Sequence, residues 1–184
     1  VRGETETGIT TMFMDEGLDT GDMLLQEKLP ISQTMTTAEL HDAMMQLGAD
    51  VLEKTILSLA AGTLERIPQD ETHSTYAPLL SKETGCIDWQ KNAREIHDLV
   101  RGLNSWPGAY SILNGQKFKI WRTRPAEGTA NPGEIVSVTP QGLLVGTGKG
   151  MLEILELQAP NKKKMKASDY VRGHGLHLPA RFDA

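Results

Sequence analysis

The sequence predicts an α/β domain followed by a small domain built mainly of β-strands. The first half has two strand-like segments and one long amphipathic helix, and the second half has several short apolar segments separated by turn residues. Charge divides the chain in a similar way, because residues 1–85 contain 5 Lys/Arg and 15 Asp/Glu, whereas residues 86–184 contain 14 and 9. Two halves with opposite net charge indicate two domains with different tasks.

The predicted α/β part covers residues 1–62. Residues 8–14 and 23–29 have the character of strands, and the glycine-rich segment between them is expected to be a turn. Thr36 and Glu39 can form a capping box, so a helix is expected to begin there and to end before a glycine. The predicted apolar face of this helix consists of Leu40, Met44, Leu47, Val51, Leu52, Ile56 and Leu59.

The predicted β part covers residues 86–184, after a linker over residues 63–85 that lacks any periodicity. A short helix with Asn92 as its N-cap should come first. A hairpin should follow around Asn114-Gly115, the dipeptide that type I′ turns favour. Closely spaced short strands of this kind are typical of a small barrel. The later strands are expected over residues 133–138, 143–146 and 151–157.

Composition argues against several classes of protein. No apolar run approaches the ~20 residues that a membrane-spanning helix needs. The single cysteine, Cys86, excludes an internal disulfide and is typical of a reducing cytoplasm, where we expect the protein to work. His174 and His177 lie close together, but no further ligand lies near them in the sequence, so no metal site is predicted.

The acidic turn over residues 15–22 is the first candidate for chemistry. Its glycines, Gly17 and Gly21, allow the backbone to turn tightly and to approach a ligand closely. A carboxylate held there, such as that of Asp19, can accept a proton or orient a water molecule. A solvated loop between two strands is an equally simple interpretation. The segment from Asp19 to Gly21 also matches the short aspartic protease signature, but the second copy that paired carboxylates require is missing.

A basic cluster that follows the predicted barrel strands is the second candidate. Phosphate contacts from such a cluster give salt-sensitive affinity for nucleic acid. A solubilising surface is the alternative interpretation of the same residues. The segment from Trp106 to Tyr110 is expected instead to be structural, as a rigid turn that places an aromatic side chain in the mouth of the barrel. The basic cluster consists of Lys162, Lys163, Lys164 and Lys166, with Arg172 further along the chain.

Five segments, in order along the chain, match the motifs of one known family. Residues 3–10 read GETETGIT, and residues 15–24 read DEGLDTGDML. Residues 75–89 contain TYA, LSKE and IDW, and residues 101–110 read RGLNSWPGAY, with serine where the family has proline. The basic segment from residue 161 to residue 173 matches the family's ending. Together these segments resemble the methionyl-tRNA formyltransferase family.

The resemblance implies an enzyme that transfers a formyl group from 10-formyltetrahydrofolate to the amino group of methionyl-initiator tRNA, for the initiation of translation. It implies a catalytic role for Asp19, because the matching aspartate in related enzymes works beside an asparagine and a histidine as the amine attacks the formyl carbon. Gly17, Leu18 and Gly21, which lie on the same turn, are then expected to bind substrate. The resemblance implies no metal.

The resemblance also implies a more specific fold. Residues 1–62 would be the C-terminal part of a Rossmann-like catalytic domain, and residues 86–184 would be an OB-like β-barrel that helps to hold tRNA. The tRNA is expected to contact the barrel through Lys162, Lys163, Lys164, Lys166 and Arg172. We expect the protein to be a monomer.

The asparagine and the histidine lie upstream in the family, in a segment that these 184 residues do not contain. Because the chain also begins at Val1 rather than at a methionine, we expect it to be part of a longer protein. By itself it should have no formyltransferase activity. The apolar faces of residues 1–62 should also lack partners, since the first strands of the family's sheet are missing.

Two other functions agree with the same residues. A formyltransferase that acts on an amino sugar nucleotide would have a similar aspartate turn and a similar barrel, although the lysine-rich tail favours tRNA. A stand-alone RNA-binding module is the alternative from a different class, because only the second half of the chain contains a complete domain of the family.

Overall fold

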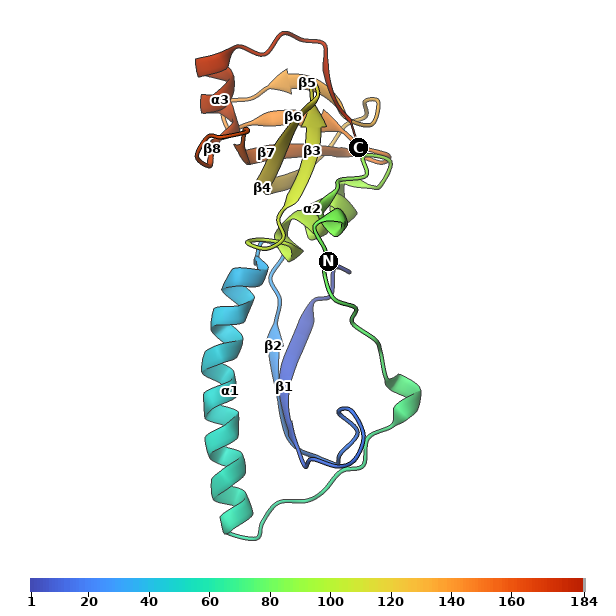
Figure 1. Cartoon of the computed structure of the whole chain (residues 1–184), viewed down its shortest axis with the longest axis vertical. Coiled ribbons are helices and arrows are strands. Elements are labelled where there is room, and N and C mark those ends of the chain that lie inside the picture. The colour runs from blue at the N-terminus through green and yellow to red at the C-terminus, as the bar shows by residue number, and fades with distance from the viewer. Residues whose placement is uncertain (184) are drawn as a thin grey trace. The chain divides into compact units, whose positions relative to one another are not determined.

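The computed structural model describes residues 1–183, which form two compact units (Figure 1). One unit is Glu4–Leu79, and the other combines Val1–Gly3 with the described residues from Leu80 onwards. The segment expected to be a linker is divided between them, with residues 63–79 in the first unit and residues 80–85 in the second. We call them the hairpin unit and the barrel unit.

The hairpin unit consists of two antiparallel strands and one long helix. Strand β1 (Glu6–Met12) pairs with β2 (Met23–Pro30), from Glu6 opposite Pro30 to Thr11 opposite Leu25, with a register shift at Met12. Helix α1 (Thr37–Ala60) packs along both strands (Figure 1). A short 3₁₀ turn, η1 (Glu71–His73), lies in the segment that returns from the helix.

The ends of α1 are set by the residues that the sequence indicates. The Thr36 hydroxyl accepts a hydrogen bond from the Glu39 backbone N–H, and the Glu39 carboxylate accepts one from the Thr36 N–H at 2.8 Å. The predicted capping box is therefore confirmed. Gly62 follows the helix with φ = +67°, a left-handed conformation that glycine adopts at little cost.

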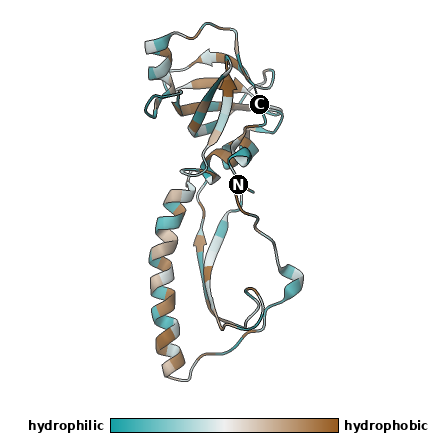
Figure 2. Ribbon diagram, in the orientation of Figure 1, coloured by the Kyte–Doolittle hydropathy of each residue, from teal (hydrophilic) through white to brown (hydrophobic). Residues whose placement is uncertain are grey.

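The face of α1 that packs on the hairpin differs from the predicted one in its second half. Val51 and Thr55 are buried there, and the Thr55 hydroxyl lies 2.8 Å from that of Thr11 on β1. A helix turns about 100° per residue, so the positions next to them point elsewhere. The assignment of Leu52, Ile56 and Leu59 to the packed face is therefore wrong, because at least half of each is exposed. Figure 2 shows hydrophobic residues in the C-terminal half of α1, and several of them are exposed.

The barrel unit contains six antiparallel strands that close on themselves. Their order is β4-β3-β9-β5-β6-β7, and β7 pairs again with β4 to complete the circle. A two-residue strand, β8 (Met165–Lys166), extends the sheet beyond β7. Because the barrel is closed, each of the six strands pairs with a neighbouring strand on both sides. The six strands are β3 (Ala109–Leu113), β4 (Gln116–Ala126), β5 (Glu134–Val138), β6 (Leu143–Gly146), β7 (Met151–Gln158) and β9 (Ala180–Asp183).

Two α-helices and a 3₁₀ turn complete the barrel unit: α2 (Ala93–Gly102), α3 (Ala167–His174) and η2 (Glu83–Gly85). The Asn92 side chain caps α2 as predicted, by accepting a hydrogen bond from the Glu95 N–H at 2.9 Å. Asn114 and Gly115 connect β3 to β4 with positive φ values of 51° and 73°, which confirms the predicted type I′ hairpin. No helix among residues 1–183 is both long and apolar enough to span a membrane.

Aromatic side chains fill the inside of the barrel. The Trp89 ring stacks on that of Phe182 with 5.5 Å between centroids, and Phe118 contacts Phe182 edge to face. The Trp89 indole N–H donates to the Ser111 hydroxyl at 2.9 Å, and this hydroxyl donates in turn to the Asp183 carbonyl. Of the two aromatic residues in the turn that was expected to close the mouth of the barrel, Trp106 is 61% exposed and Tyr110 is partly buried.

We expect Ser111→Ala to lower the free energy of unfolding of the barrel unit by about 1–3 kcal/mol, because it leaves the buried Trp89 N–H without an acceptor. Urea denaturation followed by tryptophan fluorescence measures this unit, since all three tryptophans belong to it. Ser137→Ala, on β5, is the matched control and should change stability by less than ~0.5 kcal/mol. Equal effects of the two substitutions would contradict this account.

Candidate functional site

The acidic turn forms a closed loop between β1 and β2. The Phe13 N–H donates to the Asp22 carbonyl at 3.0 Å, which joins the two ends of the loop. Gly21 is buried, and a Cβ atom at this position would overlap the Phe13 carbonyl oxygen. The glycine is therefore required by close backbone approach within the protein itself.

A second set of hydrogen bonds shapes the tip of the loop. One oxygen of the Asp15 carboxylate accepts from the Gly17 N–H at 2.9 Å and from the Thr20 hydroxyl at 2.7 Å. A Cβ atom on Gly17 would overlap the Thr20 hydroxyl. Among the acidic residues of the turn, Asp15 therefore has a structural role, because its carboxylate stabilises the loop.

Asp19 is held at the tip in an unusual conformation. Its φ is +56°, a left-handed backbone that is uncommon for residues other than glycine, although asparagine and aspartate adopt it more often than most. Its side chain is exposed, and no described residue forms a hydrogen bond or an ion pair with its carboxylate. The neighbouring Leu18 side chain is 89% exposed. The loop therefore presents a carboxylate and an apolar side chain to solvent together.

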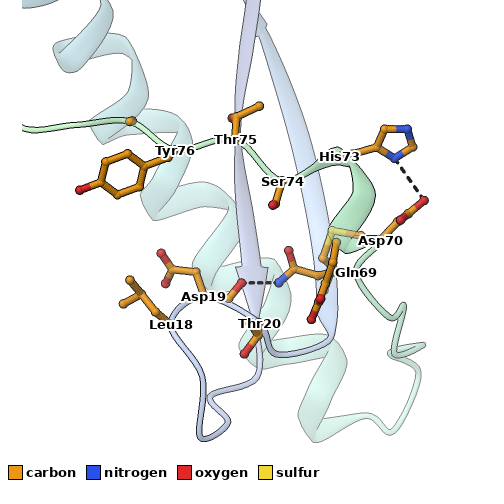
Figure 3. A pocket seen from close by; sticks show the side chains of 12 residues that line it. Leu18, Asp19, Thr20, Gln69, Asp70, His73, Ser74, Thr75 and Tyr76 are labelled. Carbon is orange, nitrogen blue, oxygen red and sulfur yellow. Dashed lines mark hydrogen bonds and ion pairs between the residues drawn. The ribbon is translucent and has the colours of Figure 1, made fainter.

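These side chains face an open concavity of about 980 Å³ within the hairpin unit. Leu18, Asp19 and Thr20 line one side of it, and the segment from Gln69 to Ala77 lines the other (Figure 3). The structure therefore brings together the predicted catalytic residue with the predicted binding residue Leu18. The predicted binding residues Gly17 and Gly21 lie in the same loop but do not line the concavity.

The returning segment adds two acidic residues to the concavity, Asp70 and Glu71, and also His73, whose Nδ1 lies 3.2 Å from the Asp70 carboxylate. The Thr72 hydroxyl and backbone N–H both donate to Asp70, and these hydrogen bonds hold the pKa of the Asp70 carboxyl below its ordinary value. Asp70 is therefore ionised at neutral pH. With Asp19 and Asp70 in its lining, the concavity is expected to have a negative potential that favours an amine or ammonium group.

Sequence reasoning missed two residues of this site, Arg66 and Gln69. The Arg66 guanidinium binds the Asp22 carboxylate at 2.8 Å and lies 4.7 Å from the centroid of the Phe13 ring. The Gln69 amide donates to backbone carbonyls of the loop. Both residues lie in the stretch that was interpreted as a linker, and no local pattern marks them.

The basic cluster lies in the barrel unit, on and before strand β8. All four lysines are exposed. Lys164 binds Glu156 at 2.8 Å, and Arg172 binds Asp169 at 3.3 Å. Lys162, Lys163 and Lys166 form no ion pair with the residues that the structure describes. Three of the five predicted cations therefore have their charge free for a phosphate.

The donor groups of the site suit an organic ligand better than a metal ion. Among residues 1–183, no group of three or more His, Cys, Asp or Glu side chains is arranged to hold a metal. The concavity combines the apolar surface of Leu18 and Tyr76 with the carboxylates of Asp19 and Asp70. Ligand pockets commonly combine apolar surface with a few polar groups.

Comparison with known protein families identifies the class of this chain. A model described as "Formyl transferase, C-terminal domain" matches residues 79–175, and a model described as "Formyl transferase" matches residues 1–56. The first match begins at Leu79, where the structure divides into its two units. The chain therefore belongs to the formyl transferase family.

Within this family, the chain is similar to methionyl-tRNA formyltransferases. The protein of that name from Ruminiclostridium cellulolyticum is 51% identical over 180 residues, which are 96% of this chain and 58% of the relative. The one from Acetivibrio thermocellus is 46% identical over 95% of this chain and 57% of the relative. The chain thus spans less than three-fifths of the length of these curated relatives.

Solved structures confirm the fold at low sequence identity. HypX from Aquifex aeolicus matches 95% of this chain and 32% of its own with a TM-score of 0.70 at 19% identity. An N-formyltransferase from Helicobacter canadensis, in complex with folinic acid and dTDP-3-aminofucose, matches 83% of this chain and 56% of its own with a TM-score of 0.67 at 22% identity. A methionyl-tRNA formyltransferase from Clostridium thermocellum matches 67% of this chain and 52% of its own with a TM-score of 0.51 at 21% identity.

We expect Gly21→Ala to destabilise the hairpin unit by about 1–3 kcal/mol, because the new methyl group overlaps the Phe13 carbonyl and forces the loop to open. Hydrogen exchange of the Phe13 amide, which closes the loop, should be faster in the variant.

The matched control is Gly48→Ala on α1, where a Cβ atom would contact only the Ile9 side chain at an ordinary 3.9 Å. This change should slow exchange in the hairpin unit, since alanine favours a helix over glycine by about 1 kcal/mol. Effects of the same sign in the two variants would argue against the packing explanation.

Proposed function

We propose that the complete protein transfers a formyl group from 10-formyltetrahydrofolate to the amino group of methionyl-initiator tRNA. The observation that carries this proposal is identity of 46–51% with curated methionyl-tRNA formyltransferases across nearly the whole chain. The exposed Asp19 carboxylate, held at the tip of a closed loop, supports it. The reaction serves the initiation of translation, and the single unpaired cysteine supports a place in the cytoplasm.

Asp19 is the proposed catalytic residue of this chain. In formyl transfer the attacking amine must lose a proton, and the departing nitrogen of the donor must gain one. A carboxylate without a protein partner, in a concavity lined by a second ionised carboxylate, can hold the substrate ammonium group and accept its proton.

The chemistry of the loop fits the formyl donor, which would supply the formyl group. Leu18 offers an exposed apolar surface beside the carboxylates, and the glycine-rich backbone allows close approach. Gly17 and Gly21 contribute indirectly, because their lack of a side chain lets the loop close. We therefore propose Gly17, Leu18 and Gly21 as donor-side residues of the complete site.

The barrel unit is proposed to be an OB-like domain that holds tRNA. Its lysine cluster would contact phosphates, with Lys162, Lys163 and Lys166 available for this and Lys164 exchanging its bond to Glu156 for a phosphate. Arg172 would contribute in the same way after leaving Asp169. Such contacts position an RNA without reading its sequence.

The hairpin unit is proposed to be the C-terminal part of a Rossmann-like catalytic domain. Its match to the formyl transferase model over residues 1–56 supports this assignment. The exposed apolar residues of α1 support it as well, since a helix in such a domain packs between a sheet and its neighbours. These residues are Met45, Leu52, Ile56, Leu57 and Leu59.

A formyltransferase acting on an amino sugar nucleotide is less supported. The sugar N-formyltransferases share the fold at 22–23% identity, which does not decide the substrate. A solved methionyl-tRNA formyltransferase is equally distant at 21%, so the preference rests on the curated methionyl-tRNA enzymes that are 46–51% identical over nearly the whole chain. A stand-alone RNA-binding module would not need the acidic loop, whose bonds hold a carboxylate in the concavity.

We expect the full-length gene product to formylate methionyl-initiator tRNA and the 184-residue chain to give no turnover. In the full-length protein, Asp19→Asn should lower kcat by about 10²–10⁴-fold, because the amide cannot accept a proton. Asp50→Asn, an exposed position on α1, is the control and should leave kcat unchanged. Lack of activity towards this tRNA in the full-length protein, together with activity towards an amino sugar nucleotide, would overturn the proposed substrate.

We expect the triple substitution of Lys162, Lys163 and Lys166 by glutamine to weaken tRNA binding. The slope of log Kobs against log salt should become shallower by about one for each lost phosphate contact. Fluorescence anisotropy with labelled tRNA at several salt concentrations measures both quantities on this chain.

The matched control replaces three other exposed cations of the barrel unit, Lys91, Lys149 and Arg181, by glutamine. It changes the net charge equally, so a purely long-range effect of charge would appear in both variants. An unchanged slope in the Lys162/Lys163/Lys166 variant would remove these lysines from the proposed tRNA surface.

A further inference from the structure

The side-chain amide of Gln69 bridges two carbonyl groups of the acidic loop. Its nitrogen donates to the Asp19 carbonyl at 2.7 Å and to the Gly21 carbonyl at 2.8 Å (Figure 3). A carboxamide nitrogen has two hydrogens, and both can be donated to these carbonyl groups, although the same nitrogen also lies 3.7 Å from the Met12 Sδ atom. In Figure 3 the Asp19 carboxylate lies on the other side of its own backbone from Gln69. The amide thus contacts the backbone of Asp19 and leaves the carboxylate free.

Gln69 itself is held by the residues that precede it. Ile67 pairs with Met23 at the start of β2 through two backbone hydrogen bonds of 2.8 and 2.9 Å. Arg66 binds Asp22 and covers the Phe13 ring. Residues 66–69 therefore contact both ends and the tip of the loop. We call this segment the clasp.

The clasp can fix the backbone conformation of Asp19. A left-handed backbone at a non-glycine residue is sparsely populated, though less so for aspartate than for most residues, and contacts from the surroundings help to fix it. The loop's own hydrogen bonds involve Asp15, Gly17 and Thr20, and none of them reaches the Asp19 peptide. The Gln69 amide supplies that contact.

We propose that Gln69 is a positioning residue for the catalytic carboxylate. By holding the carbonyls of Asp19 and Gly21, it fixes the left-handed backbone at Asp19 and thereby the direction in which the carboxylate points. This inference rests on the proposed function, because it assigns a catalytic role to Asp19. It adds a residue from a segment 50 positions further along the chain, outside the predicted turn.

The sharpest variant is Gln69→Glu, which keeps the shape of the side chain and removes both N–H donors. The ionised carboxylate would face two carbonyl oxygens and repel them. In the full-length protein we expect kcat for formyl transfer to fall by about 10- to 100-fold, with an unchanged KM for tRNA, because misplacing a catalytic group by about 1 Å has effects of this size. Gln69→Met removes the donors without adding charge and should give a similar loss.

Gln26→Glu is the matched control for the charge and the chemical change. Gln26 is exposed on β2, and its amide donates to the Thr10 hydroxyl at 3.1 Å and not to the loop backbone. This variant should keep the kcat of the unchanged protein. Thermal unfolding of all three variants shows whether each one folds, and Gln69→Met serves if Gln69→Glu does not.

A double-mutant cycle separates positioning from a general loss of stability. If Gln69 acts through the Asp19 carboxylate, then Gln69→Glu in an Asp19→Asn background should lower kcat no further. If Gln69 only stabilises the fold, the two losses should multiply, and the proposal is overturned. Hydrogen exchange at the loop amides of this chain gives a readout without turnover, and it should accelerate in Gln69→Glu and not in Gln26→Glu.

The remaining outcomes are distinguishable. Normal kcat in Asp19→Asn would remove the proposed catalytic role of Asp19 and with it the basis of this inference. A large loss in Asp19→Asn together with normal kcat in both Gln69 variants would keep the proposed function and overturn the role of Gln69.

Discussion

The pairing of Met23 with Ile67 is the interaction on which the candidate site depends. It returns the chain to the hairpin after the long excursion through α1, and it does so with two backbone hydrogen bonds. Because of this return, Arg66 and Gln69 reach the acidic loop, and the segment that follows forms the second wall of the concavity. Without it, the loop would be an exposed acidic hairpin connection with no second wall opposite Asp19.

The barrel unit provides a rigid support for a basic surface. Closure through the β4–β7 pairing buries a continuous apolar interior, and the Trp89–Ser111–Asp183 chain satisfies the polar groups inside it. Lysines on β8 and in the turn before it then lie at the surface of a well-packed body. Phosphate contacts from such a surface need little ordering of the backbone on binding.

Features that depend on neighbouring residues could be predicted from the sequence, and features that depend on distant residues could not. The caps at Thr36 and Asn92 and the Asn114-Gly115 turn follow from local hydrogen bonding and local φ preferences. The acidic loop could be found because glycines and carboxylates are adjacent there. The two hydrogen bonds of Gln69 join positions about 50 residues apart, and no pattern within its own segment indicates them.

The packed face of α1 was predicted correctly only as far as Val51. Beyond that point, Thr55 faces the strands and Ile56 does not. The Thr55 hydroxyl forms hydrogen bonds with the Thr11 hydroxyl and the Val51 carbonyl, and hydropathy alone does not reveal these contacts. Trp106, in the turn that was expected to close the barrel, is exposed. The interior is occupied instead by aliphatic side chains together with Phe118 and Phe182, which are distant in sequence from Trp106 or on other strands.

The apolar surface left on α1 has a consequence for how the chain behaves in a cell. Two strands and one helix bury little apolar area, so the hairpin unit has only a small free-energy margin against opening. Leu52, Ile56 and Leu57 are already at least half exposed in the folded state, and opening would expose Val51 as well. Chaperones and proteases recognise such segments. As an isolated chain, the molecule would therefore be degraded from its hairpin unit first, and the closed barrel would persist longer.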